Sequence, residues 1–281
     1  MSEFRRYIVG GCTAVCLVAA VPARAATLRC PPDSVKVGNV CIDKYEASVW
    51  QIPPSNASFV KLVQAGKATL AELTAGGATL LSPGTSCSGY PPNFPNDGNW
   101  TPVPGSNPPS PGVYAVSIPG VRPTACITWF QANQACLLSG KRLLTNREWQ
   151  GAAACTPDPG TDNGSTDCNV GSADDVVNTG SRSSCKSSWG VFDMVGNVGE
   201  WVADWGDMAN VACTNWGNQT GIGGEDISCF GGNGSGGYNQ IPSAWLRGGF
   251  FVSGASAGVF AIQGGDAPST SFVRYGFRCA R

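Results

Sequence analysis

The chain has 281 residues, of which 42% are hydrophobic and only 13% charged, and its formal net charge is -1. This composition suits one large domain or two small ones with ample core material, and 38 glycines and 20 prolines indicate a loop-rich fold. The absence of a basic stripe argues against nucleic acid as a partner. The absence of histidine excludes Ser-His-Asp and Cys-His catalysis and histidine-ligated metal sites.

The first 25 residues have the pattern of an export signal. Arg5 and Arg6 form a charged start, residues 7–21 form an apolar run, and Ala23-Arg24-Ala25 fits an A-x-A cleavage site. The run is short for a membrane span, and a buried first helix is the alternative. We therefore expect an exported protein that is periplasmic, secreted or on the cell surface, with one mature domain over 26–281 and no membrane span after cleavage.

Cysteine usage agrees with export, because many thiols in an exported chain indicate disulfides. The sequence has no C-x-x-C pair, so zinc is not expected. Spacing favours a small hairpin closed by Cys30 and Cys41. Further pairs are suggested by spacing at Cys87 with Cys126, Cys213 with Cys229, and Cys155 with Cys168, where Cys185 is an equal candidate for either partner.

The segments that follow the first hairpin read as strands and then as an insertion. Residues 40–42 and 45–50 favour a strand pair that enters the domain. Residues 51–120 form the insertion, which begins with two short helical patterns in 59–81, interrupted at Gly66 and at 76–77. Its second part is rich in Pro, Gly, Asn and Ser, which leaves disorder open. We favour an ordered insertion because aromatic residues interrupt the polar run: Tyr90, Phe94, Trp100 and Tyr114.

Two helices have clear start signals. Thr128 and Gln131 form a capping box before an apolar stretch that stops at Gly140. Thr145 and Glu148 form a second capping box before Trp149.

The stretch 246–281 mixes two kinds of position. We use the name frame for the small and apolar residues at 247–249, 257–261, 267–269 and 276–279. Their residue types indicate positions where the backbone conformation restricts which side chain is accepted. Between them stand aromatic, aliphatic, amide, acidic and basic residues without a strand or helix period. A surface that contacts a partner by shape accepts such a mixture, whereas a core or a catalytic site does not.

Four ordered blocks carry a family resemblance: GKRLLTNREW (140–149), GVFDMVGNVGEW (190–201), LRGG (246–249) and GFRCAR (276–281). They resemble the formylglycine-generating enzyme (sulfatase-modifying factor) superfamily. The resemblance implies an α+β, loop-rich, C-type lectin-like fold with two helices and a small twisted antiparallel sheet. It also implies a disulfide between Cys136 and Cys279.

Enzyme activity does not follow from this resemblance. The family's copper site needs two cysteines soon after the RGG motif, because thiolates bind copper(I) well. The matching stretch here, Phe250 to Gln263, contains no cysteine. We therefore expect no copper and no catalytic residue.

The C-terminal stretch is similar to the variable region of diversity-generating retroelement target proteins. Their frame, RGG…AGVF…APS…GFR, is matched here, and the resemblance implies a lectin-like display protein whose intervening residues are diversified. The expected core residues of the frame are Val259, Phe260 and Phe277. The expected outward, ligand-binding residues, with aromatic anchors, are Phe250, Phe251, Val252, Ser253, Ser256, Gly264, Gly265, Asp266, Thr270, Phe272, Val273, Arg274 and Tyr275. The alternative is that these aromatics belong to the core.

The resemblance also implies a structural calcium site in residues 193–200. Asp193 and Glu200 would supply carboxylates, and Gly196 and Val198 would supply carbonyl oxygens, which calcium prefers. The alternative is a structural turn with Glu200 in an internal salt bridge.

The sequence therefore favours an exported, non-catalytic ligand-binding protein with a diversified region at about 246–281, whose partner is an unknown protein or surface ligand. The alternatives are a copper oxidoreductase of the formylglycine-generating type with an atypical site, and a structural non-catalytic relative.

Overall fold

The structure is a computed structural model that describes residues 28–82, 87, 89–91, 94–96, 112–158, 161–207 and 242–281. The predicted export signal, Trp100 and the Cys213–Cys229 pair lie outside these residues.

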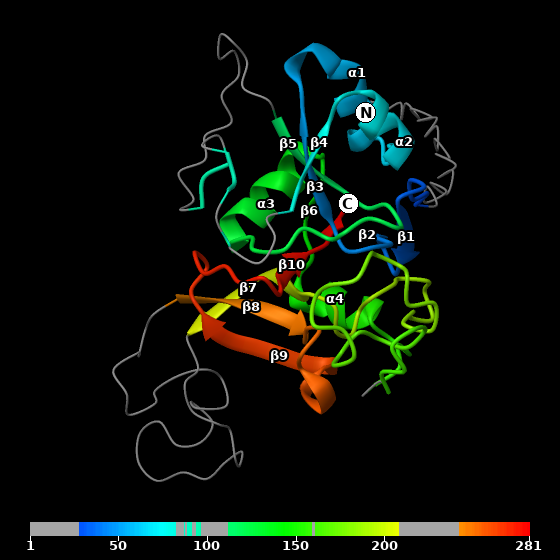
Figure 1. Cartoon of the computed structure of the whole chain (residues 1–281), viewed down its shortest axis with the longest axis vertical. Coiled ribbons are helices and arrows are strands. Elements are labelled where there is room, and N and C mark those ends of the chain that lie inside the picture. The colour runs from blue at the N-terminus through cyan, green and yellow to red at the C-terminus, as the bar shows by residue number, and fades with distance from the viewer. Residues whose placement is uncertain are drawn as a thin grey trace, which may run out of the picture.

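Three small sheets organise the described chain (Figure 1). The first has the order β1-β2-β11-β6 and consists of β1 (Ser34–Val37), β2 (Val40–Asp43), β11 (Cys279–Ala280) and β6 (Arg142–Leu143). The second has the order β4-β3-β5 and consists of β4 (Thr79–Leu81), β3 (Ser48–Ile52) and β5 (Gly112–Val116). The third has the order β10-β7-β8-β9 and consists of β10 (Tyr275–Phe277), β7 (Gly199–Asp207), β8 (Pro242–Gly248) and β9 (Gly258–Asp266).

The helices begin where the sequence predicts them. α3 (Trp129–Leu138) and α4 (Asn146–Ala152) both start at complete capping boxes, on Thr128 and Thr145. α1 (Ala57–Gln64) and α2 (Leu70–Ala75) are the two short helices of the insertion. The α+β class is confirmed, with these two further helices and with three sheets in place of the single sheet expected.

One expected strand pair is wrong. β2 pairs with β1 and β11, whereas β3 pairs with β4 and β5 in another sheet. Asp43 is the last residue of β2, and the chain turns after it to carry β3 away. The two segments are adjacent in sequence, but β2 belongs to the first sheet and β3 to the second.

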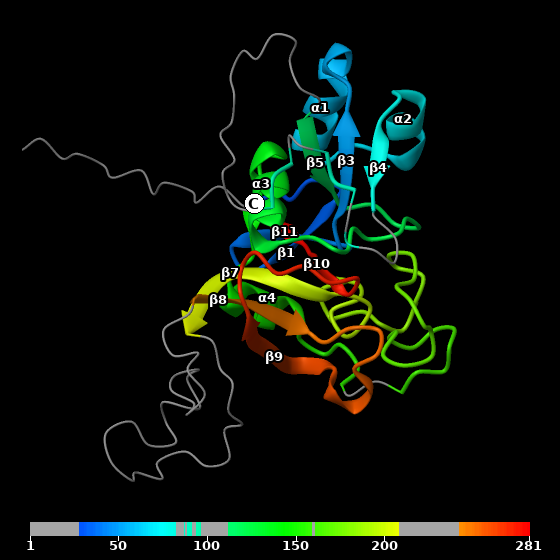
Figure 2. The same cartoon turned by 60° about the vertical axis from the view of Figure 1, so that its left-hand side comes forward.

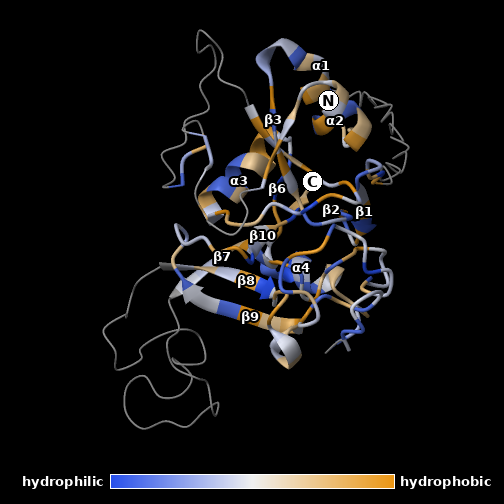
Figure 3. Cartoon of the chain, viewed as in Figure 1, coloured by the Kyte–Doolittle hydropathy of each residue, from blue (hydrophilic) through white to orange (hydrophobic). Residues whose placement is uncertain are grey.

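The last two strands, β10 and β11, lie near the centre of the molecule, and β9 is the outermost strand of the third sheet (Figures 1 and 2). The central core cluster includes Trp201 of β7, Leu246 of β8, and Tyr275 and Phe277 of β10. In Figure 3 the hydrophobic colour is concentrated on central strands such as β3 and β7. Phe94 of the insertion is 1% exposed, and the Tyr90 hydroxyl donates to the Ala125 carbonyl, so these aromatics anchor the described part of the insertion.

Four disulfides cross-link the described chain: Cys30–Cys41, Cys87–Cys126, Cys136–Cys279 and Cys168–Cys185. Cys185 rather than Cys155 is the partner of Cys168, and Cys155 is a free, exposed thiol. Disulfides in this number fit an oxidising compartment. Within the described part of the chain, no helix has the length and apolar composition of a membrane span.

Candidate functional site

The predicted ligand-binding residues lie on three consecutive segments of the third sheet. The first is the turn between β8 and β9, which contains the 3-10 helix η2 (Gly254–Ser256). The second is β9 itself, and the third is the loop 267–274 that leads into β10. β9 pairs only with β8 among the named strands, so it is an open edge strand of the sheet.

Main-chain hydrogen bonds hold these segments onto the rest of the domain. In the β8–β9 turn, Phe251 N donates to Asn197 O at 3.1 Å and Gly254 N donates to Val170 O at 2.7 Å. In the loop before β10, Phe272 O and Arg274 O accept from backbone amides of other segments at 2.9 and 2.8 Å. The backbone is therefore held mainly by groups that every residue except proline possesses. One side chain of the turn adds to this, because the Ser253 hydroxyl accepts from Phe250 N at 3.0 Å.

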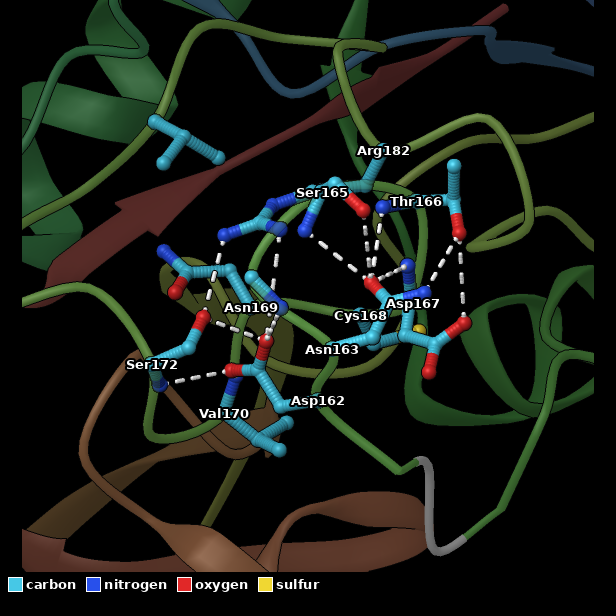
Figure 4. A network of polar contacts seen from close by, with 12 residues as sticks. Asp162, Asn163, Ser165, Thr166, Asp167, Cys168, Asn169, Val170, Ser172 and Arg182 are labelled. Carbon is cyan, nitrogen blue, oxygen red and sulfur yellow. Dashed lines mark hydrogen bonds and ion pairs between the residues drawn. The ribbon is translucent and has the colours of Figure 1, made fainter.

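Val170 is held in turn by a polar loop that the sequence analysis did not identify (Figure 4). Asp162 accepts hydrogen bonds from the amides of Val170, Gly171 and Ser172, and the nearby Cys168–Cys185 disulfide closes the loop. Burial alone would raise the pKa of Asp162, but hydrogen bonds led by those from Ser172 outweigh it and hold that pKa below its ordinary value. This ionised carboxylate organises the loop that supports η2. Three backbone amides converging on one Asp are not visible in a sequence.

The structure leaves most of the predicted residues accessible. Val252 is 54% exposed and Phe272 is 42% exposed. We define the candidate face as the predicted residues that are exposed or half-buried: Phe250, Val252, Ser253, Ser256, Gly264, Gly265, Asp266, Thr270, Phe272, Val273 and Arg274.

Two of the expected outward aromatics are buried instead. Phe251 is 6% exposed because it packs into a cluster with Ala125, Val176 and Val198. Tyr275 is fully buried because β10 pairs with the central strand β7, and its ring lies 5.4 Å from that of Trp201. These two side chains support the candidate face from below.

The opposite correction applies to Phe260, which was expected in the core. It is 77% exposed, and Ile262, two residues further along β9, is 52% exposed. Alternate residues of a strand point to opposite faces, and no described element covers this face of the edge strand. Val259 is partly buried and Phe277 fully buried, as the frame interpretation expects.

A cavity of about 270 Å³ opens between the β8–β9 turn and β9. Its lining includes Leu246, Phe250, Ser253, Ser256 and Gln263. Apolar side chains form much of its wall, and hydroxyl and amide groups and the Arg247 side chain form the rest. Such a mixture is typical of small binding pockets.

An aromatic cluster adjoins this cavity. The Arg274 guanidinium carbon lies 4.5 Å from the ring centroid of Phe250 and 5.1 Å from that of Phe272. The Tyr275 hydroxyl donates to Asp266 at 2.9 Å and accepts from Gln263 at 2.6 Å. Burial first, and then the Asp266 charge, raise the pKa of Tyr275 to about 12, so the phenol stays protonated as a donor.

The residues predicted for calcium lie in a buried ionic network. Both Glu200 oxygens accept from Arg278 Nε at 2.8 Å, and Trp149 Nε1 donates to the same carboxylate at 2.7 Å. Asp193 accepts from Gly180 N at 2.7 Å. Each oxygen of Glu200 already has a donor, so the four predicted residues do not fit calcium in this arrangement. Among the described residues, no three or more carboxylates or thiols are grouped for a metal.

The network carries more carboxylates than it has cations to neutralise them. Burial is the largest cause that raises the pKa of Asp193 to about 7, and it also raises the pKa of Glu46 well above its ordinary value. Glu46 accepts from Val198 N at 3.1 Å, so it lies against the 193–200 turn that contains Asp193. Protons can therefore supply the charge balance that a calcium ion would otherwise provide.

This arrangement predicts that stability falls as pH rises from about 4 to about 7. The folded-state pKa of Asp193, about 7, exceeds its ordinary value of 3.8. The folded chain thus holds the proton more tightly, and the stability this contributes is lost as pH rises through that folded pKa. We expect Asp193→Asn to raise Tm by several degrees at pH 8 and to flatten its pH dependence, as measured by calorimetry. An unchanged pH profile in the variant would contradict this account, and a large rise in the wild-type Tm with millimolar calcium would restore the metal interpretation.

No curated protein sequence matches the chain. Among solved structures it is similar to the Major Tropism Determinant P3c variant, with 19% identity and a TM-score of 0.45, covering 89% of this chain and 52% of that one. It is similar to Treponema denticola variable protein 1, with 20% identity and a TM-score of 0.38, covering 57% and 71% of the two chains. PvdO from Pseudomonas aeruginosa gives 17% identity, a TM-score of 0.41, and coverage of 86% and 80%.

The chain spans only 37% of the length of the Major Tropism Determinant I1 variant and about half of the P3c variant. The family model gives the wider match, because it extends over residues 12–281. The chain therefore belongs to the family of the sulfatase-modifying factor enzyme 1-like domain.

Proposed function

We propose that the protein is an exported, non-catalytic ligand-binding protein, and that the candidate face is its interchangeable binding surface. The observation that carries this proposal is that main chain and side chains have different roles in residues 249–275. Main-chain atoms make most of the hydrogen bonds that fix the segments, while the side chains of the candidate face remain accessible. A surface built this way keeps its shape while its contact chemistry changes.

The same segments argue against the copper oxidoreductase alternative. The stretch 250–263 has no cysteine and the chain has no histidine. The free thiol that the described residues do contain, Cys155, lies outside the candidate face. The family's soft copper ligands therefore have no counterpart there.

The proposal is tested by sequencing this gene from many closely related isolates. We expect amino-acid differences to concentrate at the candidate-face positions, while the frame at 247–249 and 276–279 stays constant. Differences spread evenly through the domain would overturn the proposal. Secretion of the chain from its host, with its first 25 residues removed, tests the export part separately.

A matched pair of substitutions tests whether the face is separable from the core. Phe272→Ala should change the free energy of unfolding by less than about 0.5 kcal/mol, since its ring is 42% exposed. Phe251→Ala, which truncates the same side-chain type at 6% exposure, should cost about 3 kcal/mol. Denaturant unfolding of both variants measures the difference. Equal losses would mean that Phe272 belongs to the core, as the alternative interpretation holds.

A further inference from the structure

Arg274 is the basic residue of the candidate face. Its guanidinium lies against three aromatic rings, with centroid distances of 4.5 Å to Phe250, 5.1 Å to Phe272 and 5.8 Å to Tyr275. Contacts of this kind hold a cation in place by its flat faces.

The N–H groups of Arg274 are unused by the described protein. Arg274 makes no hydrogen bond or ion pair with any described residue, and its Nε is a buried donor without an acceptor. Asp266, the acid of the same face, is engaged by Gln263 and by the Tyr275 hydroxyl. An arginine has five N–H donors arranged as a fork that matches a carboxylate. Within the part of the chain that the structure describes, Arg274 is thus a positioned cation without an anionic partner.

The surroundings add an apolar neighbour to this cation. Phe250 stacks on Arg274 and also lines the cavity of about 270 Å³, together with Leu246. Phe272, the second ring in contact with the guanidinium, is 42% exposed. A ligand carboxylate at Arg274 would therefore lie beside a recess suited to an apolar side chain.

We propose that Arg274 receives an acidic side chain of a protein ligand, with an adjacent apolar residue of that ligand in the neighbouring cavity. This rests on the proposed binding function and names the chemistry of the partner. Arginine between aromatic rings at the centre of an interface is the composition of a binding hot spot. A hydrogen bond to a charged group contributes enough to change affinity about tenfold or more.

Selection from a random displayed peptide library tests the proposal with the full chain as bait. We expect wild type to enrich Asp or Glu next to an apolar residue, and Arg274→Gln to lose the acidic preference. The matched control is Lys67→Gln, which removes an exposed charge of the same sign elsewhere and should keep the preference. A synthetic copy of an enriched peptide with its Glu replaced by Gln should bind wild type at least about tenfold more weakly and bind Arg274→Gln with unchanged affinity.

Each other outcome counts against a specific statement. Enriched peptides without acids, or the same acids selected by Arg274→Gln, would overturn the role of Arg274 and leave the binding function standing. Binding to acidic glycans on an array, without enriched peptides, would overturn the protein ligand. No binding by wild type in either format would count against the proposed function itself. Arg274→Gln should unfold within about 3 °C of wild type, which separates lost recognition from lost folding.

Discussion

Arg278→Met is expected to lower the free energy of unfolding by about 4 kcal/mol, because it leaves buried carboxylates without their cation. Arg278 and Glu200 are each 1% exposed, and Arg278 Nη2 approaches Glu200 Oε1 to 2.5 Å. The same guanidinium donates to the carbonyls of Asp43 and Phe192 at 3.2 and 2.8 Å. One side chain thus links Glu200 of β7 to Phe192 and to Asp43 of the first sheet.

Two further variants serve as controls for the loss expected with Arg278→Met. Arg122→Met breaks an ion pair with Asp175 whose side chains are 29% and 50% exposed, so it should cost at most about 1 kcal/mol. Adding Glu200→Gln to Arg278→Met removes the stranded charge and should restore part of the loss. Urea unfolding with the disulfides intact measures all three. If Arg278→Met were no worse than Arg122→Met, the buried network would have no special role.

The second large effect is expected for the Cys136–Cys279 disulfide. Its cysteines are 143 residues apart, compared with 11 for Cys30–Cys41. Closing the longer loop restricts the unfolded chain more, so Cys136→Ala with Cys279→Ala should cost about 5 kcal/mol. Cys30→Ala with Cys41→Ala should cost about 3 kcal/mol on the same account.

The order of these losses is the informative quantity. Both variants remove one disulfide and two sulfur atoms, so the chemical change is nearly the same. Differential calorimetry of the two therefore compares the stabilisation from closing a long loop with that from closing a short one. Losses in the reverse order would show that packing in the folded state, and not restriction of the unfolded chain, determines how much each disulfide stabilises the protein. The longer loop contains every segment of the candidate face, so the same double variant should also loosen that face.

Local signals in the sequence predicted local structure well. The capping boxes at Thr128 and Thr145 each span only four residues, and both form. The Cys30–Cys41 hairpin likewise depends on a short segment. The family motifs supplied the Cys136–Cys279 pair, which no spacing rule would have found.

Properties set by the tertiary arrangement were harder to predict. The exposure of Phe260 depends on β9 being the edge of its sheet, and the burial of Tyr275 depends on β10 lying beside β7. Asp193 and Glu200 carry the composition of a calcium loop, but Arg278 comes from 78 residues beyond Glu200 to occupy its carboxylate. A residue pattern shows which groups are present, but it does not show which partner binds them in the folded chain.

The fixing of residues 249–275 by their own amides limits what the segment can accept. Phe251, Gly254, Thr270 and Tyr275 all donate their main-chain N–H groups. A pyrrolidine ring has no hydrogen to donate and fixes its own torsion, so proline at these places would release the loop whatever its side chain offered. These four positions are therefore closed to one imino acid, a restriction imposed by folding and independent of any ligand.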